Sequence, residues 1–107
     1  MTTAEFHFAG DFIKAFKVSG HSGFANEGED IVCASVSSAV WMTVNGLENV
    51  IGAKVSYKGE DALVTLDVKD ESLKDAFPML ESLRQFLCNL SIEYEDYLTV
   101  KEVHENV

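Results

Sequence analysis

Apolar and polar residues alternate in two short stretches near the start of the chain, on either side of a Gly10-Asp11 pair. Phe6 and Phe8 alternate with polar neighbours, and a second aromatic and aliphatic run follows the pair. A period of two is typical of a strand with one buried face, and a Gly-Asp pair between two such runs favours a tight turn. The pattern therefore predicts a β-hairpin over residues 4–19.

From Ile31 onward, apolar residues recur at spacings of three and four, which predicts a helix. The recurring set comprises Val32, Val36, Ala39, Val40, Thr43, Leu47 and Val50. Other apolar residues, Trp41 and Met42 among them, fill much of the opposite side, and a helix that is apolar nearly all round is typically buried. Asp30 is a preferred N-cap residue and Gly52 a preferred stop. We therefore expect a buried helix between these two residues.

A second period-two pattern covers residues 53–69 and predicts another hairpin, with Gly59 and Glu60 near its turn. Residues 72–95 return to helical spacing. Their apolar stripe comprises Leu73, Phe77, Leu80, Leu83, Leu87 and Leu90. Pro78 conflicts with this helix because an interior proline removes a hydrogen bond and clashes with the preceding turn. The helix therefore either begins close before Pro78 or is kinked there.

Residues 97–103 predict a closing strand. The element order is then β-β-α-β-β-α-β, which places the chain in the α+β class, with two helices and a mostly antiparallel or mixed sheet. The length of 107 residues is typical of one domain, and no repeat or linker interrupts it. We expect a single domain over residues 1–107.

The chain is strongly acidic, with 8 basic and 18 acidic residues and a net charge of −10. Such a chain repels phosphate backbones, so we expect no direct binding of nucleic acid. A basic peptide or protein fits better as a partner. The alternative is that the acidity only keeps the protein soluble.

The two cysteines, Cys33 and Cys88, are too few for a disulfide framework. The stretch MTTAEFHFAGDF lacks the basic start and apolar core of a signal peptide. No apolar run reaches the roughly 20 residues that a membrane span needs. We expect a cytoplasmic protein with reduced thiols and no membrane contact.

Candidate chemistry gathers in the stretch GHSGFANEGEDIVCASVS. If Asp30 caps the helix, Cys33 lies in the first turn, where the positive end of the helix dipole favours a thiolate. The carboxylate of Asp30 opposes this effect, so a cationic partner is needed, and His21 is the candidate. Cysteine activated by histidine is a known nucleophile–base pair, and the N–H groups at a helix start can receive an oxyanion.

The glycines upstream of this helix, Gly20, Gly23 and Gly28, permit backbone conformations that are closed to other residues. They allow either the close approach of a substrate backbone or the motion of a lid. Phe24 is the only bulky apolar residue among them.

Other interpretations of the same residues remain open. Cys33 is also compatible with a small buried residue of a helix. A phosphate-binding loop is disfavoured, because no lysine follows the glycines and Glu27, Glu29 and Asp30 repel phosphate. A metal site is not expected, because His21, Asp30 and Cys33 are the only cluster and lack a second cysteine or histidine.

The stretch VSGHSGFANEGEDIVCASVS closely resembles the signature of the ribosomal-processing cysteine protease family, called Prp. That signature runs as Gly-His-Ala-Gly, a short variable stretch, and then Gly-x-Asp-Ile-Val-Cys-Ala-Ala-Val-Ser. This chain has Ser22 and Ser35 where the family often has alanine. Element order and length match across essentially the whole chain.

The resemblance implies a cytosolic bacterial endopeptidase that needs no cofactor. It implies removal of an N-terminal extension from a large-subunit ribosomal protein precursor, with cleavage after a phenylalanine, by a protein that forms homodimers. By position, Cys33 is the nucleophile and His21 the base. Asp30 and Ser37 occupy supporting motif positions, since Ser37 follows Cys33 by one helical turn. Residues expected to form a substrate loop are Gly20, Gly23, Phe24 and Gly28.

Within this resemblance, Asp30 either orients His21 or only caps the helix, and Ser37 either orients the site or only packs. Cys88 is expected to be inert, and Trp41 to belong to the core or to a dimer surface. The alternative function is a non-enzymatic ribosome-assembly or protein-interaction factor that uses the loop for docking.

Overall fold

A computed structural model of the chain describes residues 1–105. Its elements are β1 (Thr2–Ala9), β2 (Phe12–Ser19), α1 (Ile31–Asn45), η1 (Gly46–Ile51), β3 (Val55–Glu60), β4 (Leu63–Val68), η2 (Asp70–Ser72), α2 (Leu73–Glu93) and β5 (Leu98–His104). The predicted α+β class and the predicted order of strands and helices are confirmed.

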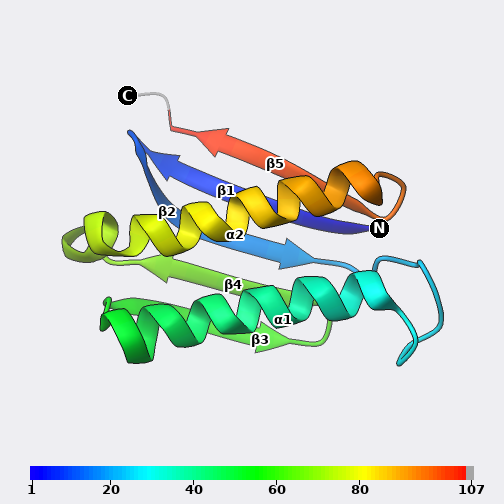
Figure 1. Cartoon of the computed structure of the whole chain (residues 1–107). Coiled ribbons are helices and arrows are strands. Elements are labelled where there is room, and N and C mark those ends of the chain that lie inside the picture. Colours follow the sequence, from blue (N-terminus) through cyan, green and yellow to red (C-terminus); the bar gives the residue numbers. More distant parts are fainter. Residues whose placement is uncertain (106–107) are drawn as a thin grey trace.

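The five strands form one mixed sheet in the order β3-β4-β2-β1-β5. Neighbouring strands are antiparallel except at one edge, where β5 runs parallel to β1. Both long helices lie across the same face of this sheet, and the loop before α1 lies at one end of the molecule (Figure 1). The fold is therefore a two-layer arrangement of helices on a sheet.

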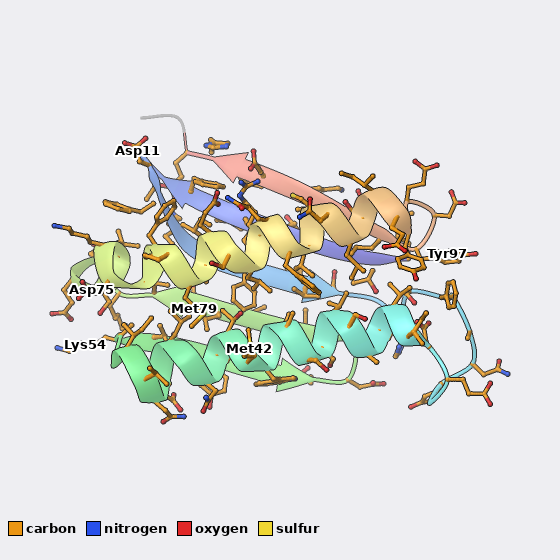
Figure 2. All side chains as sticks on the ribbon, viewed as in Figure 1. Asp11, Met42, Lys54, Asp75, Met79 and Tyr97 are labelled. Carbon is orange, nitrogen blue, oxygen red and sulfur yellow. The ribbon has the colours of Figure 1, made fainter. Side chains whose placement is uncertain are left out.

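The core lies between these two layers. Successive residues of β1 alternate between buried and half-buried, so that one face of the strand meets the helices. The largest fully buried side chains are Phe6, Phe16, Ile13, Leu47, Leu66, Leu80, Leu87, Leu98, Val32, Val40 and Thr43. Gly46 packs against the side chain of Met79 on α2, since a Cβ atom there would lie 2.4 Å from the terminal carbon of Met79. Figure 2 shows Met79 between α2 and α1.

The first predicted hairpin is confirmed, with Gly10 and Asp11 as its turn between paired Ala9 and Phe12. Gly10 has φ +61°, and Asp11 does not have a positive φ. A positive φ at the first central position alone fits a type II′ turn, whose twist matches that of a hairpin. This hairpin ends at Ser19, directly before the glycine-rich loop.

The second hairpin is confirmed, and Gly59 and Glu60 lie near its turn as expected. Both residues belong to β3, and the turn consists of Asp61 and Ala62, with Ala62 at φ +57°. The glycine at position 59 is explained by packing and not by the turn, because a Cβ atom there would lie 2.7 Å from the ring of Trp41 on α1. The glycine therefore admits a close contact between α1 and the sheet.

The helix that begins after Asp30 reaches Ile51 as expected, with its last turn widened into the π-helix η1. Gly52 ends it in the left-handed conformation at φ +74°. The expectation of a buried helix is wrong, because only one face packs on the sheet. Met42 is 66% exposed and Trp41 is 41% exposed. Figure 2 shows Met42 on the outer side of α1.

The continuous helix Ile31–Ile51 has 21 residues and contains an 18-residue window with a mean hydropathy of 1.2. It is long and apolar enough to cross a membrane by length and composition alone, which differs from the expectation drawn from the sequence. A core helix of a globular domain meets the same criteria, and 39% of that window is buried. Because its buried side chains pack on the sheet, we interpret it as a core helix.

The helix α2 begins at Leu73, after the short helix η2, so Pro78 lies in its second turn. Of the two alternatives for Pro78, the helix that begins shortly before the proline is the one observed. The closing strand β5 is confirmed, and its parallel pairing brings Leu98 beside Thr2. The connection from α2 to β5 therefore lies at the same end of the molecule as the loop before α1.

Candidate active site

The start of α1 is organised by the carboxylate of Asp30, which confirms the predicted N-cap. Its Oδ1 accepts the backbone N–H of Cys33 at 2.9 Å. Its Oδ2 accepts the hydroxyl of Ser22 at 2.5 Å and the backbone N–H groups of Phe24 and Ala25 at 3.1 and 3.3 Å. One side chain thus joins the loop to the helix, and no contact with His21 is involved.

These contacts keep Asp30 ionised although it is only 8% exposed. Burial raises the pKa of the carboxyl group, but the hydrogen bonds from Ser22, Cys33, Ala25 and Phe24 together outweigh burial and lower the pKa to about 2. A carboxylate with such a low pKa is a weak base. Asp30 therefore acts as a structural acceptor and not as a general base.

Cys33 lies in the first turn of α1, as predicted, and its side chain is half-buried. Its Sγ accepts the backbone N–H of Ser22 at 3.3 Å and lies 3.5 Å from the hydroxyl oxygen of the same residue. The N–H of Cys33 itself is bonded to Asp30, so this particular donor at the helix start is occupied.

Ser22 is a site residue that the sequence analysis missed. It is 2% exposed and contacts both Asp30 and Cys33. The available signal was its departure from the alanine that is common at this position of the family signature. A polar residue in place of a small apolar one becomes informative when it is buried, because a buried hydroxyl needs hydrogen-bond partners.

His21 precedes Ser22 and has an exposed side chain. Its Nε2 lies 4.0 Å from Oδ1 of Asp61 in the turn between β3 and β4. The neighbouring backbone holds the two segments together, since the N–H of Gly20 donates to the carbonyl of Ala62 at 2.9 Å. Within residues 1–105, no hydrogen bond joins His21 to Cys33.

Two adjoining cavities meet at the predicted pair. The first, of about 280 Å³, lies between α1 and the β3–β4 turn, and the second, of about 460 Å³, lies between α1 and the loop. Cys33, His21 and Ser37 line both cavities. An extended chain that passes from one cavity to the other would therefore cross the thiol of Cys33.

The glycines of the predicted substrate loop border these cavities. Gly20 lines the first cavity, and Gly23 and Gly28 line the second, each with a positive φ. Gly20 also excludes any side chain, because a Cβ atom there would lie 2.5 Å from the carbonyl oxygen of Met1.

Phe24, also expected in the substrate loop, lines neither of these two cavities. Its ring makes edge contacts with Tyr94 and Tyr97, at centroid distances of 5.5 and 5.1 Å. Tyr97 is labelled in Figure 2 at this end of the molecule, beside the end of α2. Phe24 therefore anchors the loop to the connection between α2 and β5.

The second cysteine, Cys88, is half-buried on α2 and contacts Arg84. Both cysteines are free thiols. Within the described part of the chain, no group of three or more histidine, cysteine, aspartate or glutamate side chains is placed to hold a metal ion.

A thiol at the first turn of a helix, with a histidine bordering the same open cavities, is typical of cysteine-dependent hydrolases. The family model described as cysteine protease Prp matches residues 1–99, and the chain belongs to this family. The resemblance seen in the sequence is thereby confirmed. No curated protein sequence matches the chain.

Solved structures share the fold. The ribosomal processing protease Prp from S. aureus, in complex with a covalently linked product peptide, matches with a TM-score of 0.90 and 19% identity, over 95% of this chain and 99% of that chain. The same protease in complex with a substrate peptide matches with a TM-score of 0.83 and 18% identity, over 95% and 99%. SMU.848 from Streptococcus mutans matches with a TM-score of 0.84 and 24% identity, over 98% and 96%.

Proposed function

We propose that this member of the Prp family is an endopeptidase in which Cys33 is the nucleophile and His21 the general base. The observation that carries the proposal is that both residues line both cavities at the start of α1. Ser37, which borders the same two cavities, has a supporting role in orienting the site. Asp30 supports the site through the backbone of Cys33.

The proposed reaction begins when His21 removes the proton of the Cys33 thiol. The sulfur then attacks the carbonyl carbon of the scissile peptide, and the carbonyl oxygen becomes an oxyanion. Collapse of this intermediate breaks the C–N bond, and the proton on His21 passes to the departing amine. Water, deprotonated by His21, then hydrolyses the thioester and restores the thiol.

Formation of the pair requires His21 to turn from Asp61 toward Cys33. This movement is open to it because its side chain is 63% exposed and belongs to a glycine-flanked loop. Catalytic hydrogen bonds are often long or poorly aligned before substrate binds and tighten in the complex. In this proposal, the arrangement seen here is the resting state of the pair.

The proposed substrate is the N-terminal extension of a large-subunit ribosomal protein precursor, cut after a phenylalanine. Membership of the Prp family supports this, and so does the S. aureus protease of the same fold, which is described as a ribosomal processing protease with a bound substrate peptide. Val36, Val40 and Trp41 give the first cavity an apolar wall that fits an aromatic side chain. Ribosomal proteins are basic, and the acidic residues Glu27 and Glu60 border the cavities.

We further propose that the protein acts in the cytoplasm, where ribosomal proteins are made, and that it forms a homodimer. The exposed apolar side chains of Trp41, Met42 and Val50 support the second statement, since exposed apolar surface on a helix favours association. No cofactor takes part in the proposed reaction.

Purified protein incubated with the extended ribosomal precursor tests the proposal. We expect cleavage by the unsubstituted protein and by Cys88→Ala, and none by Cys33→Ala, with all three folded as judged by circular dichroism. An intact precursor that still forms a complex with the unsubstituted protein would instead favour a non-enzymatic interaction factor.

A further inference from the structure

Ser22 determines the surroundings of the Cys33 sulfur in this structure. Its backbone N–H donates to Sγ at 3.3 Å, and the thiol of Cys33 donates to its hydroxyl oxygen at 3.5 Å. Because Ser22 is 2% exposed, water does not compete for its hydroxyl. The hydrogen bonds of the resting thiol therefore involve Ser22, and His21 makes none of them.

The single proton of the Ser22 hydroxyl belongs to the bond with Asp30. That carboxylate also accepts backbone N–H groups from Phe24, Ala25 and Cys33, all of which can only donate. The low pKa of Asp30, where hydrogen bonds outweigh the opposing effect of burial, agrees with an ionised group. An ionised carboxylate has no proton to give, so Ser22 is the donor in the 2.5 Å contact.

It follows that the hydroxyl of Ser22 presents only lone pairs toward Cys33. A lone pair accepts a hydrogen bond from S–H, whereas it repels a negatively charged sulfur. The backbone N–H of Ser22 has no such preference for the thiol, since it can donate to either form. The hydroxyl and the N–H of the same residue thus act differently on the charge of Cys33.

We propose that the hydroxyl of Ser22 is a positioning group that holds Cys33 as a neutral thiol in the resting protein, through hydrogen bonds from Cys33 to Ser22 and from Ser22 to Asp30. Attack on a substrate then requires the S–H group to leave Ser22 and to pass its proton to the base, which is His21 in the proposed mechanism. The inference rests on the proposed role of Cys33 as nucleophile.

The substitution Ser22→Ala tests this effect. It removes the hydroxyl and leaves the backbone N–H of residue 22 in place. Of the titratable groups that border the cavities around Cys33, it leaves His21, Glu27, Glu60 and Asp61 with the contacts they have. Asp30 loses the hydrogen bond from the Ser22 hydroxyl and keeps those from the backbone N–H groups of Phe24, Ala25 and Cys33.

The first test is the rate of alkylation by iodoacetamide as a function of pH, in a Cys88→Ala background so that only Cys33 reacts. A hydrogen bond of this kind shifts an equilibrium by roughly threefold to tenfold. We expect Ser22→Ala to react faster than the parent by about this factor at neutral pH, and equally fast at high pH, where both sulfurs are ionised. An unchanged rate, or an equal change at every pH, would overturn the proposal.

Two further variants separate the hydroxyl from general effects on the loop. Ser35→Ala is the matched control, because it is the same change at the other serine that stands where the family often has alanine, and the Ser35 hydroxyl donates to the carbonyl of Ile31 within α1. Ser22→Thr keeps the hydroxyl. We expect both to react like the parent.

A second measurement does not depend on whether Ser22→Ala folds. Raman spectroscopy of the Cys88→Ala protein at neutral pH detects the S–H stretch of Cys33 directly. We expect the band to be present, and its absence would show a resting thiolate and end the proposal. This readout is separate from catalysis, since cleavage that persists in Cys33→Ala would refute the nucleophile and leave the S–H band unaffected.

Discussion

The carboxylate of Asp30, the residue before α1, accepts the backbone N–H of Cys33 at 2.9 Å, and Cys33 is the proposed nucleophile in the first turn of that helix. The same carboxylate also accepts three donors from the loop that carries His21. One ionised side chain thus determines the backbone geometry on both sides of the site. Replacement of Asp30 should therefore change the free energy of unfolding by an amount that depends on pH.

We expect Asp30→Asn to destabilise the protein by about 2 kcal/mol at pH 7, because a pKa shift from 3.8 to about 2 has a free energy of this order. The folded-state pKa is the lower one. The stabilisation is therefore fully present above about pH 3.8 and is lost as the pH falls toward 2. Urea unfolding at about pH 7 and about pH 3 measures the difference from the parent at each pH.

Asp67→Asn is the control for that experiment, because Asp67 is an exposed residue of β4. It should change stability little at either pH. If Asp30→Asn lowers the free energy of unfolding by the same amount at both pH values, the stabilisation does not depend on the ionisation of Asp30.

Substitution of His21 should reduce cleavage and leave the fold intact. Loss of a general base typically lowers a rate by about 10²–10⁴-fold, whereas removal of an exposed side chain costs little stability. His104→Ala is the control, because His104 stacks on Phe8 at 4.5 Å and does not line either cavity. If His21→Ala and His104→Ala cleave the precursor at comparable rates, His21 is not the general base.

Two glycines allow strain in the backbone to be separated from a local clash. Gly10 and Gly20 have φ values of +61° and +87°, but only a Cβ atom at Gly20 meets another atom, the Met1 carbonyl oxygen at 2.5 Å. Gly10→Ala should therefore cost about 1–2 kcal/mol for the left-handed conformation alone. Gly20→Ala should cost more and should also lower activity, because it displaces the residue before His21. Thermal unfolding and cleavage assays measure both effects, and equal losses of stability would contradict the role of the clash.

The strands and helices could be predicted because each depends on a local period of apolar residues. The exact turn residues of the second hairpin, Asp61 and Ala62, could not, because Gly59 packs against the ring of Trp41, which is distant in the sequence. The exposed face of α1 was missed for a related reason. A count of apolar residues does not reveal that the sheet covers only one side of the helix, so Met42 was expected to be buried.

The residues of the candidate site also fall into two groups, those that local patterns predict and those that depend on contacts between distant segments. Cys33 and Asp30 could be placed because helix-capping preferences are local, and His21 followed from the need for a cationic partner and from the family signature. Ser22 and Asp61 could not be placed, since their roles depend on contacts between segments. Asp61 reaches the vicinity of His21 because it belongs to the turn between β3 and β4, which lies beside the loop.

The acidic residues around the cavities should accelerate the encounter with a basic precursor. Glu27 borders the second cavity and Glu60 the first, and neither has a salt-bridge partner within residues 1–105. Complementary charges raise association rates, and salt screens exposed charges beyond about 10 Å at 0.1 M. Glu27→Gln combined with Glu60→Gln should therefore lower the second-order rate of precursor cleavage at low salt, on the order of twofold to tenfold, and should make this rate less sensitive to added salt.

The matched control for this double variant is Glu48→Gln combined with Asp70→Asn, two exposed residues that border neither cavity. Both double variants change the net charge equally, so a difference between them reports the field at the site and not the total charge of the protein. We expect the control to keep most of the parent's rate and salt dependence. A precursor in which alanine replaces the phenylalanine before the cut should be cleaved more slowly at every salt concentration, because an apolar contact is not screened. If the two double variants lose rate equally, the total negative charge governs the encounter, and if neither loses rate, the acidity serves only solubility.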